Sequence, residues 1–76
     1  MTQKINYIEN SDELAVNLKK AREQAELTQK QVSKMVSIER SSLSCYEIGR
    51  SLPSIFTLMK LSIVYHVTLE ELLLKH

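Results

Sequence analysis

The chain has 76 residues and a formal net charge of +1, with 43% apolar and 25% charged residues and a single Gly, Pro and Cys. This length allows one small domain, the lone cysteine excludes an intrachain disulfide, and no apolar run approaches the roughly 18 residues of a membrane span. One Cys and two His are too few for a zinc site, and the N-terminal residues lack the apolar segment of a signal peptide, so we expect a cytoplasmic protein with no metal or other cofactor.

Helices account for the whole predicted fold, because apolar residues recur at helical spacing from end to end and no segment alternates as a strand would. The first helix is predicted to begin at an N-cap of Asn10 or Ser11 and to end near positions 24–26. Its inward residues are predicted to be Leu14, Leu18, Ala21 and Ala25. We assign residues 1–11 to a flexible N-terminal arm and residues 12–76 to the folded domain.

Two short helices are predicted next. The second helix begins after Thr28, because Thr28 and Gln31 form a capping box in which each side chain bonds the other's backbone N–H. The third begins at Ile38 or Glu39 and stops at Gly49, which adopts a left-handed backbone without strain. The residues predicted to face inward are Val32, Met35 and Val36 in the second helix and Leu43 and Tyr46 in the third.

Two more helices complete the predicted five. Pro53 disfavours helix in the residue before it, so positions 50–53 are predicted to form a turn and Ser54 to cap a fourth helix. That helix is predicted to bury Ile55, Leu58, Leu61, Ser62 and Tyr65. Thr68 is predicted to cap a short fifth helix over positions 69–75. Its core residues are predicted to be Leu69, Leu72 and Leu73.

The third helix lies within the stretch SIERSSLSCYEIGR, positions 37–50, whose serines and cysteine suggest either catalysis or binding. A nucleophile needs a base within reach, and the only imidazoles, His66 and His76, lie at the end of the fourth helix and at the C-terminus, so we expect no enzyme activity. The residues left on the outward face are Arg40, Ser41, Ser44 and Cys45. Taken alone, this face fits a binding surface and an ordinary solvated surface equally well.

Charge and helix order indicate binding more clearly. Positions 19–60 contain eight basic and four acidic residues, whereas the remaining ends contain two basic and five acidic residues. A basic middle is a weak indication of an anionic partner. The second and third helices, joined by a tight turn and flanked by the other three, make a helix-turn-helix within a five-helix domain, and this arrangement favours binding.

Four runs of residues resemble one protein family. They are LKKAREQAELTQ at 18–29, SIERSSLSCYEIGR at 37–50, PSIFTLMKL at 53–61 and VTLEELL at 67–73. Through these runs, residues 12–74 are similar to the Cro/repressor-type, or XRE-like, helix-turn-helix DNA-binding domain. The resemblance implies an all-α, lambda-repressor-like fold in a bacterial or phage transcriptional regulator. It implies a repressor that inserts its third helix, at about 39–48, in the major groove of double-stranded DNA.

The resemblance also implies roles for individual residues. The base-contacting side chains would be Arg40, Ser41, Ser44 and Cys45, of which Arg40 can bond guanine O6 and N7 together. The phosphate contacts would come from Gln29, Arg22, Arg50 and Lys30. A salt bridge between Arg22 and Glu47 is implied to join the first helix to the third.

Three positions depart from the family pattern. Ser37 occupies the usual turn glycine, so either it has a positive φ or the turn differs. His66 occupies the usual glycine at the end of the fourth helix, where we expect it to cap the helix and not to bind a ligand. Cys45 replaces a longer polar residue, which shortens its reach into the groove. As a lone cysteine, it is expected to be inert and not a redox sensor.

Three residues of the fourth helix, Phe56, Met59 and Ile63, form an apolar strip outside the predicted inward face. One explanation is burial against Tyr7 and Ile8 of the arm. We favour a homodimer interface, because paired third helices about 34 Å apart recognise a two-fold operator. The alternative function is an antitoxin or anti-repressor-like protein-interaction module, whose strip binds another protein and whose DNA binding is secondary.

Overall fold

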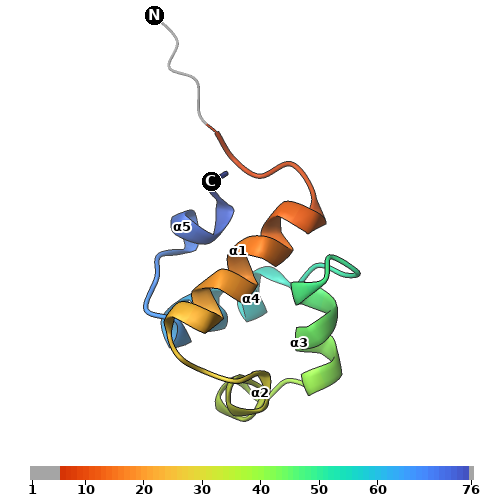
Figure 1. The fold of residues 1–76 in the computed structure, drawn as a ribbon, viewed down its shortest axis with the longest axis vertical. Coiled ribbons are helices and arrows are strands. Elements are labelled where there is room, and N and C mark those ends of the chain that lie inside the picture. The colour runs from red at the N-terminus through yellow and green to blue at the C-terminus, as the bar shows by residue number, and fades with distance from the viewer. Residues whose placement is uncertain (1–5, 76) are drawn as a thin grey trace, which may run out of the picture.

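The computed structural model describes residues 6–75, so residues 1–5 of the predicted arm and His76 lie outside the described part of the chain. The described residues form five helices: α1 (Ser11–Gln24), α2 (Gln29–Val36), α3 (Arg40–Glu47), α4 (Ile55–Val64) and α5 (Leu69–Leu73). The all-α prediction is confirmed, since the β structure of residues 6–75 is limited to an isolated bridge between Tyr7 and Leu74. Helix α2 lies at one end of the molecule and α5 toward the other (Figure 1).

Side-chain caps fix the start of four of these helices. Asn10, Thr28, Ser54 and Thr68 each accept a hydrogen bond from the backbone N–H three residues later. The predicted capping box of α2 is confirmed, because Oε1 of Gln31 also accepts a bond of 2.8 Å from the N–H of Thr28. Each cap stabilises its helix by about 1 kcal/mol. Helices as short as α2 and α5 would not form alone, so these caps matter to the fold.

Three helices are followed by a left-handed residue that is not glycine. Glu26, Ser37 and His66, after α1, α2 and α4, have φ angles of 59°, 56° and 56°. Ser37 therefore takes the positive φ that was one of the two alternatives for its turn, whereas the left-handed Glu26 was not predicted. The turn after α3 has a glycine at the corresponding position, Gly49, with a φ angle of 78°. Because a left-handed non-glycine residue costs roughly 1–2 kcal/mol, these turns reduce the stability of the domain.

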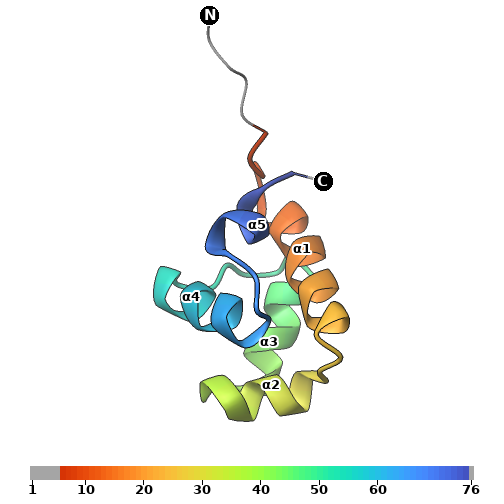
Figure 2. The ribbon, with the colours of Figure 1, turned by 90° about the vertical axis from the view of Figure 1, so that its left-hand side faces the viewer.

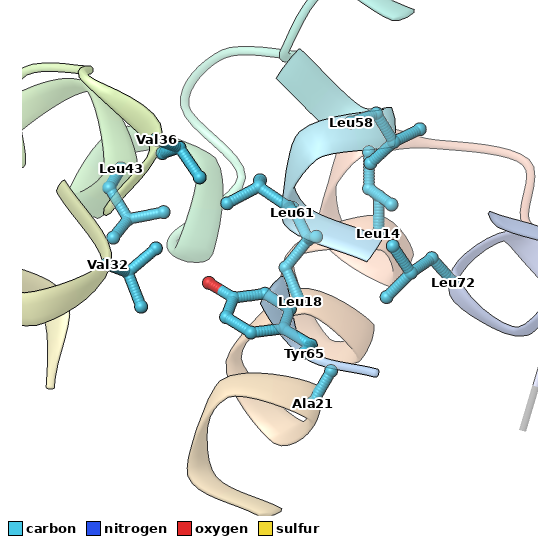
Figure 3. Close-up of a cluster of buried hydrophobic side chains, with 10 residues drawn as sticks. All are labelled: Leu14, Leu18, Ala21, Val32, Val36, Leu43, Leu58, Leu61, Tyr65 and Leu72. Carbon is cyan, nitrogen blue, oxygen red and sulfur yellow. The ribbon is translucent and has the colours of Figure 1, made fainter. Parts of the chain in front are cut away.

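The core is one apolar cluster to which all five helices contribute (Figure 3). Its fully buried members are Leu18, Leu43, Leu61, Leu72 and Val32. Tyr65 is buried in the same cluster, and its hydroxyl points toward the side where Val32 and Leu43 lie (Figure 3). That hydroxyl has no hydrogen-bond partner among the described residues. Burial raises the pKa of Tyr65.

Two of the predicted inward positions are wrong. Met35 of α2 and Ile55 of α4 are each more than half exposed. Met35 lies in the last turn of its helix and Ile55 is the first residue of its own, where the helix extends beyond the core. Helical spacing predicts which face a residue shares but not how far the neighbouring helices extend, so it overstates burial at helix ends.

A buried polar contact joins α1 to α5. The two hydrogens on Nδ2 of Asn17 are donated to the backbone oxygens of Leu72 and Leu74, each at 2.8 Å. Sequence reasoning assigned Asn17 no role. Because a buried amide without partners is costly, this contact fixes the position of α5 and of the chain that follows it.

Residues 6–8 of the predicted arm pair with the end of the described chain. The N–H of Ile8 donates to the oxygen of Leu73 at 2.8 Å, and the N–H of Lys75 donates to the oxygen of Asn6 at 2.9 Å. The explanation that buries the apolar strip of α4 against the arm is therefore wrong. Tyr7 bridges to Leu74, and the strip remains exposed.

Candidate nucleic-acid interface

Helices α2 and α3 form the helix-turn-helix, joined by the turn at positions 37–39. The left-handed Ser37 reverses the chain, and the N–H of Ile38 closes the turn by donating to the oxygen of Ser33 at 3.0 Å. Glu39 is the N-cap of α3, but its side chain makes no capping bond. The carboxylate at the start of α3 is thus exposed and free of the helix.

One side of α3 faces the core. Leu43 is completely buried between α3 and its neighbours, and Ile38 and Tyr46 pack against the same cluster while half-buried. Glu47 is also buried, which is unusual for a carboxylate and requires bonding partners.

Those partners come from α1 and α2. We call Arg22, Gln29 and Glu47 the Glu47 anchor. Nε and Nη2 of Arg22 donate to the two carboxylate oxygens of Glu47 at 2.7 and 2.9 Å, and Nε2 of Gln29 donates to Oε1 of Glu47 at 3.1 Å. The side chains of Glu47 and Arg22 are only 2% and 13% exposed. The anchor fastens α3 to α1 and α2 through one buried carboxylate.

The anchor also limits what Arg22 and Gln29 can offer to DNA. The hydrogen bonds to Glu47 raise the pKa of Arg22, so the guanidinium stays charged. A further bond runs from Nη1 of Arg22 to the oxygen of Leu27 at 2.8 Å. Arg22 therefore uses three of its five N–H groups within the protein, and Gln29 uses one of its two amide hydrogens. Each keeps a donor for a phosphate oxygen, with Gln29 at the very start of α2.

The end of α3 is held against the start of α1. Oγ of Ser11 donates to the oxygen of Gly49 at 3.0 Å. A Cβ atom added at Gly49 would overlap Oδ1 of Asp12 and lie 3.3 Å from the Asp12 Cα. The left-handed backbone favours glycine, and a side chain at this position would also be crowded by Asp12, so a substitution of Gly49 would strain the end of α3.

Of the four residues predicted to contact bases, Ser41 and Cys45 lie on the side of α3 opposite Leu43, whereas Arg40, the first residue of α3, lies three residues before Leu43 and shares its face. Arg40 and Ser41 are exposed, whereas Ser44 and Cys45 are half-buried. The accessible part of α3 is therefore its N-terminal half. Its chemistry suits base edges: a guanidinium bonds guanine, a hydroxyl donates or accepts, and the Glu39 carboxylate can accept from cytosine N4.

Exposed cations lie on α2 and just beyond α3. Lys30 and Lys34 of α2 and Arg50 just beyond α3 are all exposed. The backbone N–H groups at the start of α2 lie beside Lys30, where the positive end of the helix dipole favours an anion. These groups can contact phosphates.

The predicted dimer residues lie on α4, which runs along one side of the molecule with α2 below and α5 above it (Figure 2). Phe56, Met59 and Ile63 are 71%, 46% and 72% exposed. Large apolar side chains this exposed on one helix face are typical of an interaction surface.

Among the described residues, no three His, Cys, Asp or Glu side chains are grouped so that they could hold a metal ion. The helices within residues 6–75 are also too short or too polar for any of them to cross a membrane.

The sequence matches a helix-turn-helix family model and a relative of the helix-turn-helix type. A family model described as Helix-turn-helix, HTH_3, matches residues 18–72. YqaE of Bacillus subtilis (strain 168), an uncharacterised HTH-type transcriptional regulator, is 39% identical over 57 residues, or 75% of this chain. The chain spans about half, 49%, of the length of that relative.

Solved structures share the fold. The restriction-modification controller protein C.AhdI from Aeromonas hydrophila is 21% identical, with a TM-score of 0.77 over 82% of this chain and 94% of that chain. SinR, a master regulator for biofilm formation solved in complex with DNA, is 25% identical, with a TM-score of 0.73 over 78% of this chain and 95% of that chain.

Proposed function

Because the chain belongs to the helix-turn-helix family HTH_3, we propose that it is a sequence-specific DNA-binding transcriptional regulator. The family match over residues 18–72 contains all of α2 and α3. YqaE is named as a transcriptional regulator and SinR was solved in complex with DNA, and both support the proposal. By analogy with other helix-turn-helix proteins, α3 enters the major groove and the start of α2 abuts the backbone.

One observation carries this proposal: α3 is held from its inner side and at its C-terminal end. The Glu47 anchor and Leu43 lie on the inner side and the Gly49 contact lies at the end, which leaves Arg40 and Ser41 exposed. A helix fixed in this way loses little further freedom on binding, because its backbone is already ordered. Its small outward side chains allow close approach to base edges, and Arg40 reaches furthest.

Phosphate contacts supply most of the proposed affinity. Gln29, Lys30 and Arg50 are the groups that we propose to contact the backbone, with Arg22 contributing from its remaining donors. If a dimer makes six such contacts, affinity falls about a thousandfold between 50 and 200 mM salt, because bound counterions are released. We further propose that the bound protein represses transcription by covering its operator.

The test is selection of binding sites from random DNA, followed by gel shifts on the selected site and on unrelated DNA. Arg40→Ala is expected to weaken the selected site about 10- to 100-fold, since one bidentate guanine contact contributes about 1–3 kcal/mol. Lys34→Ala is the matched control on α2, and it should weaken both DNAs to the same small extent. Unchanged binding of every sequence by Arg40→Ala would show that α3 is not the recognition helix.

We also propose that the protein acts as a homodimer through the apolar strip of α4. A two-fold operator needs two α3 helices about 34 Å apart, and one domain of this size contacts too little DNA for tight binding. Phe56→Asp is expected to shift the protein from dimer to monomer in sedimentation. If the parent is a monomer both free and on its selected DNA, and Phe56→Asp changes nothing, the homodimer is wrong. The antitoxin-like alternative then gains support.

A further inference from the structure

The apolar strip of α4 has a symmetry that suits pairing with itself. Phe56 and Ile63 are seven residues apart, so they share one side of the helix about 10 Å apart along its axis. Met59 and Lys60 lie midway between them, Met59 toward one edge of the strip and Lys60 toward the other. A rotation of 180° about an axis that crosses the strip from the Met59 edge to the Lys60 edge therefore superposes Phe56 on Ile63. The same rotation keeps each edge on its own side.

A hollow lies beside one end of the strip. It has a volume of about 350 Å³ and is lined by Met35, Val36 and Ser37 of the α2 end and by Lys60, Ile63 and Val64 of α4. A cavity of about 150 Å³ already accommodates benzene, so this hollow has room for a benzyl side chain. Because Lys60 lines this hollow together with residues from the end of α2, helix α2 lies along the Lys60 edge of α4 and not along the Met59 edge.

We propose that two copies pair through α4 in antiparallel orientation, each placing Phe56 against Ile63 of the other copy, in the hollow beside Met35. This pairing rests on the homodimer of the proposed function and specifies its geometry. Phe56 is the largest exposed apolar side chain of α4, and nothing among the described residues covers it. The mutual contact makes the interface isologous, as a two-fold dimer requires.

The position of α2 excludes the parallel alternative. A two-fold axis along α4 would pair the helices in parallel and exchange their edges, so the two α2–α3 units would lie on opposite faces of the dimer. An axis running across the strip, from the Met59 edge to the Lys60 edge, pairs the helices in antiparallel and keeps both α2 helices on one face. Only the antiparallel dimer can present both α3 helices to one duplex.

The buried area predicts a weak dimer. Phe56, Met59, Ile63 and Met35 from both copies expose on the order of 1,000 Å² together, close to the smallest area of a specific interface. We therefore expect dissociation at micromolar concentrations in free solution. DNA binding should strengthen association, because adjacent half-sites hold both copies together.

Lys60 gives this pairing a recognisable response to salt. Both Lys60 side chains lie on the same edge near the two-fold axis, and α4 carries no acidic residue to pair with them. Their repulsion opposes the dimer and is screened by salt. Self-association should thus tighten with salt while DNA affinity falls. Lys60→Met should tighten the dimer about 1.5- to 2-fold at low salt, the usual effect of a like-charge pair.

Cysteine cross-linking tests the geometry directly. In a Cys45→Ser background, Phe56→Cys and Ile63→Cys variants are oxidised separately and as a mixture, free and on the selected DNA. The antiparallel pairing predicts a disulfide in the mixture, between one copy of each variant, and little from either variant alone. Self-linked Phe56→Cys and Ile63→Cys without the mixed product would instead demonstrate parallel pairing and overturn the proposal. Thermal unfolding of each variant checks that these exposed substitutions leave the fold intact.

Sedimentation of the parent separates the two possible failures. A parent dimer that tightens with salt and gives the mixed disulfide supports the pairing. If the parent dimerises but the mixed disulfide is absent, or if salt weakens the dimer, the pairing is wrong and the homodimer stands. If the parent stays monomeric on DNA and no variant gives a cross-link, both the antiparallel pairing and the homodimer are wrong.

Discussion

Helices α3 and α4 are held to the core by opposite means and expose opposite surfaces. A polar group, the Glu47 anchor, fastens α3 beside the buried Leu43, and α3 exposes an arginine and serines. Apolar packing around Leu61 fastens α4, and α4 exposes Phe56 and Ile63. The chemistry that attaches a helix to the core therefore does not dictate the chemistry of its outer face. The two outer faces differ in chemistry, polar on α3 and apolar on α4.

The largest expected effect tests the attachment of α3. Glu47→Ala leaves the guanidinium of Arg22 buried without its partner, so we expect a loss of about 3–5 kcal/mol in the free energy of unfolding. Urea unfolding measures it. The double variant Arg22→Met, Glu47→Leu removes both charges and should recover most of that loss. A loss below about 1 kcal/mol for Glu47→Ala would mean that the Glu47 anchor contributes little to holding α3.

The attachment of α4 is tested by a pair of substitutions on its two faces. Leu61→Ala empties a completely buried position and should cost about 3 kcal/mol in the free energy of unfolding. Ile63→Ala, two residues away and exposed, should change that free energy by less than about 0.5 kcal/mol. Denaturant unfolding at a low protein concentration measures the stability of the monomer, without a contribution from self-association. Equal losses from the two would show that the outer strip is part of the core.

A smaller effect is expected from replacing the left-handed residues in two turns, Ser37 before α3 and His66 after α4. Ser37→Gly and His66→Gly each relieve a left-handed non-glycine residue, so each should add about 1 kcal/mol to the free energy of unfolding. Only Ser37 adjoins α3, so only its substitution should alter DNA affinity as well. Gly49→Ala is the control with the opposite sign, because its Cβ would meet Asp12. A destabilised Ser37→Gly would show that the serine side chain supports the turn.

The smallest effect concerns the buried hydroxyl at the end of α4. Tyr65→Phe removes a group without a partner and should leave stability unchanged or raise it by about 1 kcal/mol at neutral pH. Burial raises the pKa of Tyr65 above its unfolded value of about 10, so above that pH the unfolded chain releases a proton that the folded chain retains. The parent should then lose stability with rising pH more steeply than the variant. Matching slopes would mean that the hydroxyl reaches water.

Local signals predicted most of the fold. Thr28, Ser54 and Thr68 cap helices where the sequence placed them, because a cap and its N–H partner are only three residues apart. Apart from the left-handed Glu26, the misses involve distant parts of the chain. Asn17 bonds oxygens about 55 residues away, which no local pattern indicates. The exposure of Met35 depends on how far α4 extends along α2, which a local pattern does not indicate either.

The site was predictable in outline from residue types and helical spacing. Spacing places Ser41 opposite Leu43, and Ser41 is exposed; Arg40 is exposed as well, but because it is the first residue of α3 and not because of its face. Spacing could not show that Ser44 and Cys45 are half-buried, because that depends on the packing of α3 against its neighbours. Nor could it show that Glu39 is the N-cap of α3, because glutamate is not among the side chains that usually cap a helix.

The pairing of residues 6–8 with residues 73–75 makes the described chain almost a closed ring. The N–H of Lys75 lies 2.9 Å from the oxygen of Asn6, so a short peptide linker between these ends would complete the ring without disturbing any helix. Ring closure over a loop of this length removes about 4 kcal/mol of conformational entropy from the unfolded chain. A backbone-cyclised form should therefore resist heat far better, with both outer faces unchanged.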